Sequence, residues 1–586
     1  MRFLGNILST VLGIFVFFII AFFGILIVAA LVGSGEETVV VKKKSVLNLD
    51  LEGVSLDYTG KFSDPIVKLI SGGDEVSFME VLNAIENAKT DDNIEGISML
   101  NTSSTLGMAQ MKALRDQLND FKTSGKFIVS YANFFTQSDY YLNSVADTIY
   151  MNPVGMMDFK GLSSEVLFFK DFQEKTGMKM EIIRHGKYKS AVEPFIANEI
   201  SESNKEQITS LLNSVWKNIS TEIGESRKIH IDTLNSIANR LGARTPELAL
   251  QTKLIDKIAY EDIYHNGIKK ALGVDKEKSY NTVDITDYTK KVNNSPVSNS
   301  SKNEIAVIYA QGEIMSGEGD VNIIGEGAIR EAIRKARRND KVKAIVLRVD
   351  SPGGNALTAE LIWRELELTK TVKPIVVSMG NYAASGGYYI AANASKIIAE
   401  PNTITGSIGV FGMLPNFHQL SKNMGINATT VKTHENAADY SLFQPLDAST
   451  ASVIQESIES IYQVFLKRVA DGRKMSMEEV DAVAQGRVWT GTEALEIGLV
   501  DALGGLELAI KEAAKLAKIE NDYKTKSYPE YDKTFDEFME SFPFAKTQEQ
   551  MLEAELGTEA YKTLQQFKRL NRQRGIQTMM PFEINI

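Results

Sequence analysis

A serine in the second half of the chain is a candidate nucleophile because small residues surround it. Ser385 lies in the stretch MGNYAASGGYYI (residues 379–390), which follows the apolar run PIVV and leads into the apolar run IAA (residues 390–392). This pattern predicts a strand, a tight turn and then a helix that starts near Gly387. Free backbone N–H groups at a helix N-terminus favour developing negative charge, as acyl transfer requires. A serine that merely caps the helix is the alternative.

A serine hydroxyl needs a neighbouring base to become a nucleophile. The stretch is not the G-x-S-x-G elbow of the α/β-hydrolases, and no histidine lies near it in sequence. Lys189 lies in IRHGKYKSAVEPF (residues 183–195), where apolar neighbours could remove water from its ammonium and lower its pKa. Lys187 and His434 are the competing bases. The residue types alone leave all three candidates open.

A second turn of small residues, DSPGGNA (residues 350–356), also follows a predicted strand and precedes a predicted helix. Glycines at such a turn let the backbone approach a ligand closely and direct N–H groups toward it. The turn lacks the G-x-x-x-x-G-K-[ST] pattern of a phosphate-binding loop. An ordinary strand-to-helix turn is the alternative reading of this segment.

The chain contains an internal repeat, which helps to distinguish residues that maintain the fold from residues that could take part in a reaction. Residues 129–142 resemble residues 377–390 at a shift of 248 positions, and the same shift aligns Pro153 with Pro401. Scaffold residues should persist in both copies, whereas chemical residues can be confined to one. At this shift Ser385 aligns with Gln137, Gly386 with Ser138, Gly353-Gly354 with Thr105-Leu106, and Lys189 with Ala437. The repeat therefore favours a chemical role for Ser385.

Each copy alternates short β-rich runs with helical patterns, which predicts an α/β fold with crossover connections. In the second copy, residues 304–309 and 344–349 read as strands, and residues 328–338 and 358–368 read as helices. We expect a tandem duplication of one α/β domain. The predicted organisation is a first repeat (46–280), a linker (281–303), a second repeat (304–520) and a C-terminal helical extension (521–586).

The N-terminal segment is long and apolar enough to anchor the chain in a membrane. No charged residue occurs from Phe3 to Ser34. About 20 apolar residues span a bilayer, so we predict a transmembrane helix over residues 11–33 within an anchor of residues 1–45. A cleaved signal peptide, the competing interpretation, has a shorter apolar region. The charges that flank the helix do not fix its orientation.

Composition excludes other classes of function. The net charge of −11 argues against a nucleic-acid partner. The chain has no cysteine, and its five histidines show no metal-ligand spacing. We therefore predict no metal and no cofactor.

Four motifs together resemble the signal peptide peptidase A family, also called protease IV, in its long two-copy form. They are YKSAVEPF (188–195), SPGG (351–354), AASGGYY (383–389) and TGSIGVFG (405–412). The resemblance implies a serine endopeptidase of the ClpP/crotonase superfamily with a Ser/Lys dyad. In that family's pattern Ser385 is the nucleophile, Lys189 is the general base and Ser407 orients the lysine. The oxyanion hole is formed by the N–H of Gly386 and one N–H of the pair Gly353-Gly354.

The resemblance also implies where such a protein works. The family's long form is a single-pass protein of the bacterial inner membrane, with its catalytic part on the periplasmic side. It assembles into a homotetramer and cleaves remnant signal peptides and other short hydrophobic peptides. Two alternatives are a non-proteolytic membrane scaffold and acyl-CoA chemistry of the crotonase type. The intact motifs argue against the scaffold, and in the acyl-CoA alternative the Lys189–Ser385 pair would have no role.

Overall fold

The computed structural model describes residues 12–17, 20, 23–24, 39–62, 75–294, 301–437, 440–533 and 576–579. Residues 12–17 are helical, but most of the helix predicted over residues 11–33 lies outside the described residues. Within the described part, no helix combines the length and the apolar character needed to cross a bilayer.

The first repeat is built on a six-stranded parallel sheet in the order β7-β5-β4-β3-β1-β8. Its strands are β1 (Ser45–Asn48), β3 (Ile94–Leu100), β4 (Phe127–Phe135), β5 (Thr148–Met157), β7 (Lys257–Ile258) and β8 (Asn281–Asp284). Its helices are α3 (Phe78–Thr90), α4 (Met108–Lys122), α5 (Gln137–Asn143), α6 (Lys170–Thr176), α7 (Glu202–Arg227), α8 (Ile231–Asn239), α9 (Pro246–Gln251), α10 (Glu261–Leu272) and α11 (Ile285–Asn294). Parallel neighbours require crossover connections, and these helices supply most of them.

The second repeat is built on an eight-stranded sheet in which β18-β16-β14-β12-β9-β20 form the main path, while β15 pairs with β14 and β19 pairs with β15. Its strands are β9 (Glu304–Gln311), β12 (Val342–Ser351), β14 (Ile375–Ala384), β15 (Lys396–Ala399), β16 (Ile404–Gly406), β18 (Val488–Thr490), β19 (Ala502–Leu503) and β20 (Lys524–Tyr528). Its helices are α12 (Glu326–Arg338), α13 (Ala356–Lys370), α14 (Gly386–Ala391), α15 (His418–Asn423), α16 (Ala448–Arg473), α17 (Met477–Val483), α18 (Gly491–Glu496) and α19 (Leu506–Ala517).

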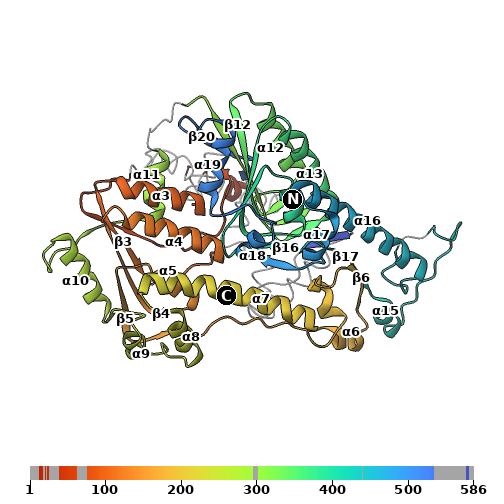
Figure 1. Ribbon diagram of the computed structural model, residues 1–586, viewed down its shortest axis with the longest axis horizontal. Coiled ribbons are helices and arrows are strands. Elements are labelled where there is room, and N and C mark those ends of the chain that lie inside the picture. The colour runs from red at the N-terminus through yellow and green to blue at the C-terminus, as the bar shows by residue number, and fades with distance from the viewer. Residues whose placement is uncertain are drawn as a thin grey trace, which may run out of the picture.

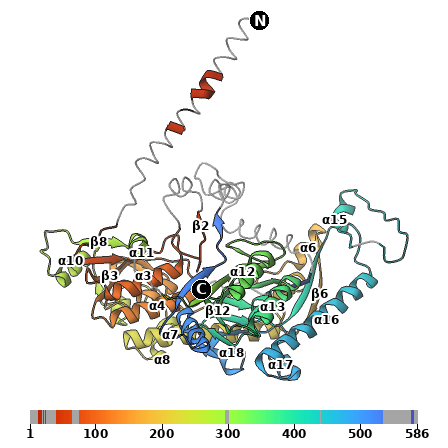
Figure 2. The ribbon, with the colours of Figure 1, turned by 90° about the horizontal axis from the view of Figure 1, so that it is seen from above.

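The two repeats share one strand order. The run β8-β1-β3-β4-β5 of the first sheet corresponds to β20-β9-β12-β14-β15 of the second. The helix pair α3 and α4 recurs as α12 and α13 at the same shift of 248 residues. Figures 1 and 2 show α3 and α4 in one half of the molecule and α12 and α13 in the other. The mixed α/β architecture with parallel sheets and an internal duplication is therefore as the sequence predicts.

Strand alternation explains why the second sheet is buried on both faces. Ile305, Val307 and Tyr309 of β9 pack with alanines of α19. Ala306 and Ile308 point to the opposite face and join the core beneath α12 and α13. Successive strand residues face opposite sides of a sheet, so a continuous apolar run fits a strand that is covered on both sides.

A third sheet joins the two repeats, in the order β11-β10-β13-β22-β17-β6. Its strands are β6 (Lys179–His185), β10 (Glu313–Met315), β11 (Ile323–Gly325), β13 (Gly353–Asn355), β17 (Val410–Asn416) and β22 (Ile576–Met579). Strand β6 comes from the first repeat and pairs antiparallel with β17 of the second repeat along its whole length. In Figure 1, α7 also extends from the first repeat toward α6 and toward the second repeat.

Several described elements lie where the sequence suggested a linker or helices. Strand β8 and helix α11 fall inside the predicted linker of residues 281–303, because β8 completes the edge of the first sheet beside β1. Strand β20 does the same for the second sheet beside β9. It lies, with β21 (Asp532–Lys533) and β22, in the segment expected to be helical. Strand β21 pairs with β2 (Lys61–Phe62). Short edge strands have few residues and little periodicity, so their pattern is weak in the sequence.

Candidate active site

Lys189 and Ser385 meet although 196 positions separate them. The Lys189 Nζ donates to the Ser385 Oγ at 2.9 Å. It also donates to Ser407, at 3.0 Å to the Oγ and 3.1 Å to the carbonyl oxygen. All three side chains are fully buried. The lysine comes from the first repeat and both serines from the second, so the cluster exists only where the two repeats meet.

The segment after β6 carries Lys189 into the second repeat. Lys189 immediately precedes a 3₁₀ helix, η1 (Ser190–Phe195). The Tyr188 N–H donates to the Gln485 carbonyl at 2.8 Å. A Cβ placed on Gly486 would lie 2.7 Å from the Cα of Lys189, so only glycine allows the two backbones to approach this closely. The β6–β17 pairing and this turn together hold the lysine in place.

Burial lowers the pKa of the Lys189 ammonium well below its ordinary value. An apolar cluster of Val192, Phe195, Phe411 and Met413 lies beside it, with its Nζ 5.9 Å from the centre of the Phe411 ring. In the described part of the chain, no carboxylate forms an ion pair with this lysine that would restore its charge. Desolvation favours the neutral amine, which can accept a proton.

Ser385 has a strained backbone and a side chain that does not cap its helix. Its φ of 55° and ψ of −114° are unusual for a residue other than glycine. Its N–H donates to the Gly406 carbonyl at 2.8 Å, which fixes the turn between β14 and α14. The Oγ makes no capping hydrogen bond to the helix. The helix-cap interpretation of this serine is therefore wrong, and its hydroxyl faces Lys189 instead.

The glycine turn at residues 353–354 lies directly beside the turn at Ser385. A Cβ placed on Gly353 would lie 2.8 Å from the Gly386 N, whereas one on Gly354 would collide with the Ile314 carbonyl of β10. Gly353 is thus the member of the pair that adjoins Gly386. Its N–H donates to the Ser351 Oγ at 3.2 Å. Both glycines have positive φ, as a turn of this shape requires.

The two competing bases lie away from the serine. Lys187 is exposed, and its Nζ lies 5.0 Å from the centre of the Tyr188 ring. His434 is also exposed, and its Nδ1 lies 3.1 Å from the Thr433 Oγ1. Neither contacts Ser385. Of the three candidate bases, the structure brings only Lys189 to the serine.

Three residues of the site escaped the sequence reasoning. Gly486 and Gly409 pack against the backbone and the Cδ of Lys189, and Thr578 lies beside Gly386. Gly486 is an isolated glycine in a polar segment, and Gly409 lies in the TGSIGVFG motif, which gives it no role of its own. The glycines in QGR (485–487) and SIG (407–409) mark turns, but nothing in the sequence links them to a lysine.

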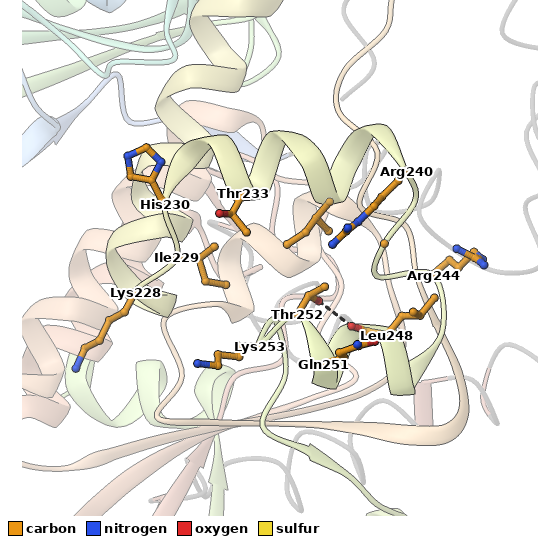
Figure 3. Close-up of a pocket in the computed structure, with 12 residues that line it drawn as sticks. Lys228, Ile229, His230, Thr233, Arg240, Arg244, Leu248, Gln251, Thr252 and Lys253 are labelled. Atoms are coloured by element: carbon orange, nitrogen blue, oxygen red, sulfur yellow. Dashed lines mark hydrogen bonds between the residues drawn. The ribbon is translucent and has the colours of Figure 1, made fainter.

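A surface pocket of about 640 Å³ lies elsewhere, at α8 and α9 of the first repeat (Figure 3). Basic side chains dominate its polar lining, and none of the residues of the Lys189–Ser385 cluster borders it. Among the residues that the structure describes, no group of three or more His, Asp or Glu residues is arranged to hold a metal ion.

The sequence of this chain matches those of several proteases over most of its length. The model of peptidase family S49 matches it twice, at residues 120–275 and 367–520, which coincide with parts of the two repeats. The chain belongs to peptidase family S49. It is 35% identical to "Protease 4" of Haemophilus influenzae over 83% of this chain and 82% of that protein. It is 36% identical to "Protease 4" of Salmonella typhi over 83% and 81%.

A plant relative shows the same extended match. "Serine protease SPPA, chloroplastic" of Arabidopsis thaliana is 33% identical over 82% of this chain and 70% of that protein. This S49 member is therefore a serine peptidase with peptide substrates. Family membership sets aside the alternatives of a non-proteolytic scaffold and of acyl-CoA chemistry.

Proposed function

We propose that this S49 peptidase is a membrane-anchored endopeptidase whose catalytic dyad is divided between its repeats, with Ser385 as nucleophile and Lys189 as general base. The observation that carries the proposal is the 2.9 Å hydrogen bond from the Lys189 Nζ to the Ser385 Oγ in a fully buried site. A base must lie within hydrogen-bond reach of the proton that it takes, and this distance meets that condition.

The chemistry begins with the neutral amine of Lys189. It takes the proton from the Ser385 hydroxyl while the Oγ attacks the carbonyl carbon of the scissile peptide bond. The resulting ammonium gives this proton to the leaving amine, and an ester links Ser385 to the acyl part of the substrate. Lys189 then deprotonates a water molecule whose oxygen attacks the ester, and it returns that proton to the Ser385 Oγ as the acyl product leaves. Ser407 orients the amine by accepting two of its hydrogen bonds.

The oxyanion of the tetrahedral intermediate needs donors beside Ser385. We assign the Gly386 N–H and the Gly353 N–H, because these two glycines adjoin each other and the nucleophile. The Gly353 N–H would exchange its long hydrogen bond to the Ser351 Oγ for a bond to the oxyanion. A donor of this kind contributes about 3–4 kcal/mol to the transition state.

The apolar N-terminus and the long two-copy form support the remaining parts of the proposal. The helix over residues 11–33 would cross the bacterial inner membrane once, with the repeats on the periplasmic side. Substrates would be remnant signal peptides and other short hydrophobic peptides, and the protein would work as a homotetramer. Fractionation of cells that express the full chain, followed by carbonate extraction, tests the anchor. Recovery of the protein in the extracted supernatant would contradict it.

Kinetics on the detergent-solubilised full chain test the dyad. We expect Ser385→Ala and Lys189→Ala each to lower kcat/KM for a fluorogenic hydrophobic peptide by at least about 10³-fold. The matched controls Lys187→Ala and His434→Ala should retain activity. A fluorophosphonate should label wild type at Ser385, as located by peptide mass spectrometry. Full activity of Lys189→Ala would exclude it as the base, and activity of Ser385→Ala would exclude the whole mechanism.

A further inference from the structure

Strands β12 and β14 lose their regular pairing just before the two turns of the candidate site. The pairing moves from Val349 opposite Met379 to Ser351 opposite Ala383, so that Asp350 alone faces the three residues of β14 in between. An irregularity of this kind interrupts the ladder of backbone hydrogen bonds and leaves backbone groups that need other partners.

The Asp350 carboxylate takes the place of the missing ladder. Its Oδ1 accepts from the Tyr382 N–H at 2.9 Å, and its Oδ2 accepts from the Asn381 Nδ2 at 3.2 Å. Asp350 lies three residues before Gly353, and Tyr382 lies three residues before Ser385. One side chain therefore connects the segment that leads to a proposed oxyanion donor with the segment that leads to the nucleophile.

Asn381 extends this connection to the first repeat. Its Oδ1 accepts from the N–H groups of Ala109 and Gln110, in the first turn of α4, at 3.1 and 3.2 Å. Gly107, the N-cap residue of α4, has no side chain that could cap the helix, and a Cβ there would lie 2.3 Å from the Asn381 Oδ1. The amide oxygen thus satisfies N–H groups that the start of a helix leaves without partners. Strand β14 is fastened in this way to a helix of the first repeat.

The charged groups that face Asp350 are Asp57 and Arg348, which pair with each other. The Arg348 Nε lies 2.6 Å from the Asp57 Oδ2, and both side chains are buried. The Gln110 Nε2 donates to the Asp57 Oδ1 at 2.8 Å. Burial and then the Asp57 carboxylate raise the pKa of Asp350 to about 7, although its two N–H donors and Arg348 act in the opposite direction.

The carboxylate occurs only in the second repeat. Thr102 aligns with Asp350 at the shift of 248 residues, and Asn133 aligns with Asn381. The Thr102 Oγ1 donates to the Leu49 carbonyl at 2.9 Å, and Asn133 is exposed. The amide persists in both copies, whereas the carboxylate accompanies Ser385 in one. This distribution favours a role in the reaction over a role in the fold.

We propose that Asp350 is a positioning residue whose carboxylate holds the Gly353 turn and the Ser385 turn in register. Asn381 fastens this arrangement to α4. The inference rests on the proposed function of the Ser385 site. The φ of 55° at Ser385 needs such support, because a strained backbone persists only where its surroundings enforce it. The first repeat then serves the reaction twice, since it supplies Lys189 and holds the strand that leads to Ser385.

Asp350→Asn in the full chain tests the role of the carboxylate. The amide keeps an oxygen for the Tyr382 N–H but presents a second donor to the Asn381 Nδ2. We expect kcat for the fluorogenic peptide to fall about 10²-fold at little-changed KM, because small displacements of reacting groups have effects of this size. The matched control Asp340→Asn, at an exposed position just before β12, should behave as wild type. An unchanged kcat in Asp350→Asn would overturn the proposal.

The exchange variant Asp350→Asn/Asn381→Asp separates positioning from folding. It keeps one carboxylate and one amide between the strands, and the carboxylate at position 381 can still accept from the N–H groups of α4. We expect its kcat to be about tenfold above that of Asp350→Asn, as for residues that are directly coupled. Recovery should be partial, because the Gln110 Oε1 loses the Asn381 Nδ2 as a donor. An exchange variant with a wild-type melting temperature but no recovery would contradict the coupling.

The pH dependence gives a readout that a purely structural role would not move. Protonation of Asp350 makes wild type resemble Asp350→Asn, whereas the titration of Lys189 affects both proteins alike. We therefore expect the ratio of wild-type to Asp350→Asn kcat to fall from about 10² at pH 8.5 to below about tenfold at pH 5.5. A ratio that stays constant with pH would show that the charge of Asp350 is not needed, and would overturn the proposal.

Hydrogen–deuterium exchange separates this inference from the proposed catalysis, because it needs no turnover. In the Ser385→Ala background, Asp350→Asn should speed the exchange of the Tyr382 N–H at least about tenfold, as measured by mass spectrometry on peptides from residues 379–390. Asp340→Asn should leave this exchange unchanged. Equal exchange with and without Asp350→Asn would overturn the inference even if the dyad is correct. Faster exchange in a protein whose Ser385→Ala form still cleaves peptides would support the connection between the strands and contradict the dyad.

Discussion

The same turn from a strand to a short helix occurs in both repeats, and the two turns use their hydroxyl groups differently. In the first repeat Thr136 precedes α5 with a φ of −67°, and its side chain caps the helix by accepting from the Asp139 N–H. In the second repeat Ser385 precedes α14 with a φ of 55°, and its hydroxyl accepts from Lys189. Backbone strain of this kind costs roughly 1–3 kcal/mol. One hydroxyl caps a helix, and the other contacts a buried lysine.

In the first repeat, other residues occupy the positions that align with Ser385 and Lys189. Gln137, which aligns with Ser385, accepts from the N–H groups of Lys160 and Gly161 and donates to the Gly161 carbonyl. Ala437, which aligns with Lys189, lies in an exposed segment. Neither copy holds both members of the Lys189–Ser385 pair. Both copies keep the scaffold, and each copy supplies one member of the pair.

Moving the serine should not move the activity. The variant Gln137→Ser/Ser385→Ala places a hydroxyl in the first repeat's turn, and the residue that aligns with Lys189 for this turn is Ala437. We expect kcat/KM for the fluorogenic peptide to stay at least about 10³-fold below wild type. Gln137→Ser alone should keep wild-type kinetics, with some loss of stability from its three hydrogen bonds. Substantial turnover by the double variant would show that the first repeat is a latent site.

The glycine turns allow a second test of the same comparison. Gly353→Ala places a Cβ against the Gly386 N at a φ of 102°, which an alanine rarely adopts. We expect kcat to fall about 10²- to 10³-fold, as for the loss of an oxyanion donor. Thr105 occupies the aligned position in the first repeat and is exposed, so Thr105→Ala should retain full activity. A Gly353→Ala enzyme with normal kcat would remove this turn from the oxyanion hole.

The sequence predicted the parts of this molecule that depend on local pattern. The strands β9 and β12 and the helices α12 and α13 appear where apolar periodicity placed them, because each buries a face that its own residues define. The alignment of the two copies showed that Ser385 is replaced by Gln137 in the first repeat. Local pattern could not select Lys189, since Lys187 lies two residues away and only the β6–β17 pairing decides which lysine enters the second repeat.

Contacts between distant segments could not be predicted from the sequence either, because they depend on how the chain pairs in three dimensions. The glycines that pack on Lys189 and the strand at Thr578 act only through partners hundreds of residues away. The two-residue and four-residue strands of the C-terminal region are too short to show alternation. The domain boundaries, drawn from the internal repeat and the polar linker, remain a prediction.

Ser407 offers a smaller effect that distinguishes positioning from structure. Ser407→Ala removes one of the two oxygen atoms by which this residue holds the Lys189 amine. We expect kcat to fall about 10- to 100-fold with little change in KM, because general-base catalysis depends on alignment. The lost acceptor also stabilised the ammonium, so the acidic limb of the pH–rate profile should move to lower pH. Ser407→Thr should restore part of the rate. A purely structural role would leave the pH profile unmoved.

The smallest expected effect is a gain in stability, whereas the variants above lose activity. Burial lowers the pKa of Lys189 well below its unfolded value of 10.5, so between the two values the unfolded chain binds the extra proton. The free energy of unfolding of wild type therefore rises with pH through that window. Lys189→Met keeps the apolar volume without this term, and we expect its melting temperature to exceed that of wild type by a few degrees at pH 7. The advantage should shrink by pH 9.5, and Lys187→Met, on an exposed side chain, should show neither change. A Lys189→Met protein less stable than wild type at pH 7 would contradict this expectation. It would mean that the hydrogen bonds of Lys189 to Ser385 and Ser407 stabilise the fold by more than the desolvation of the amine destabilises it.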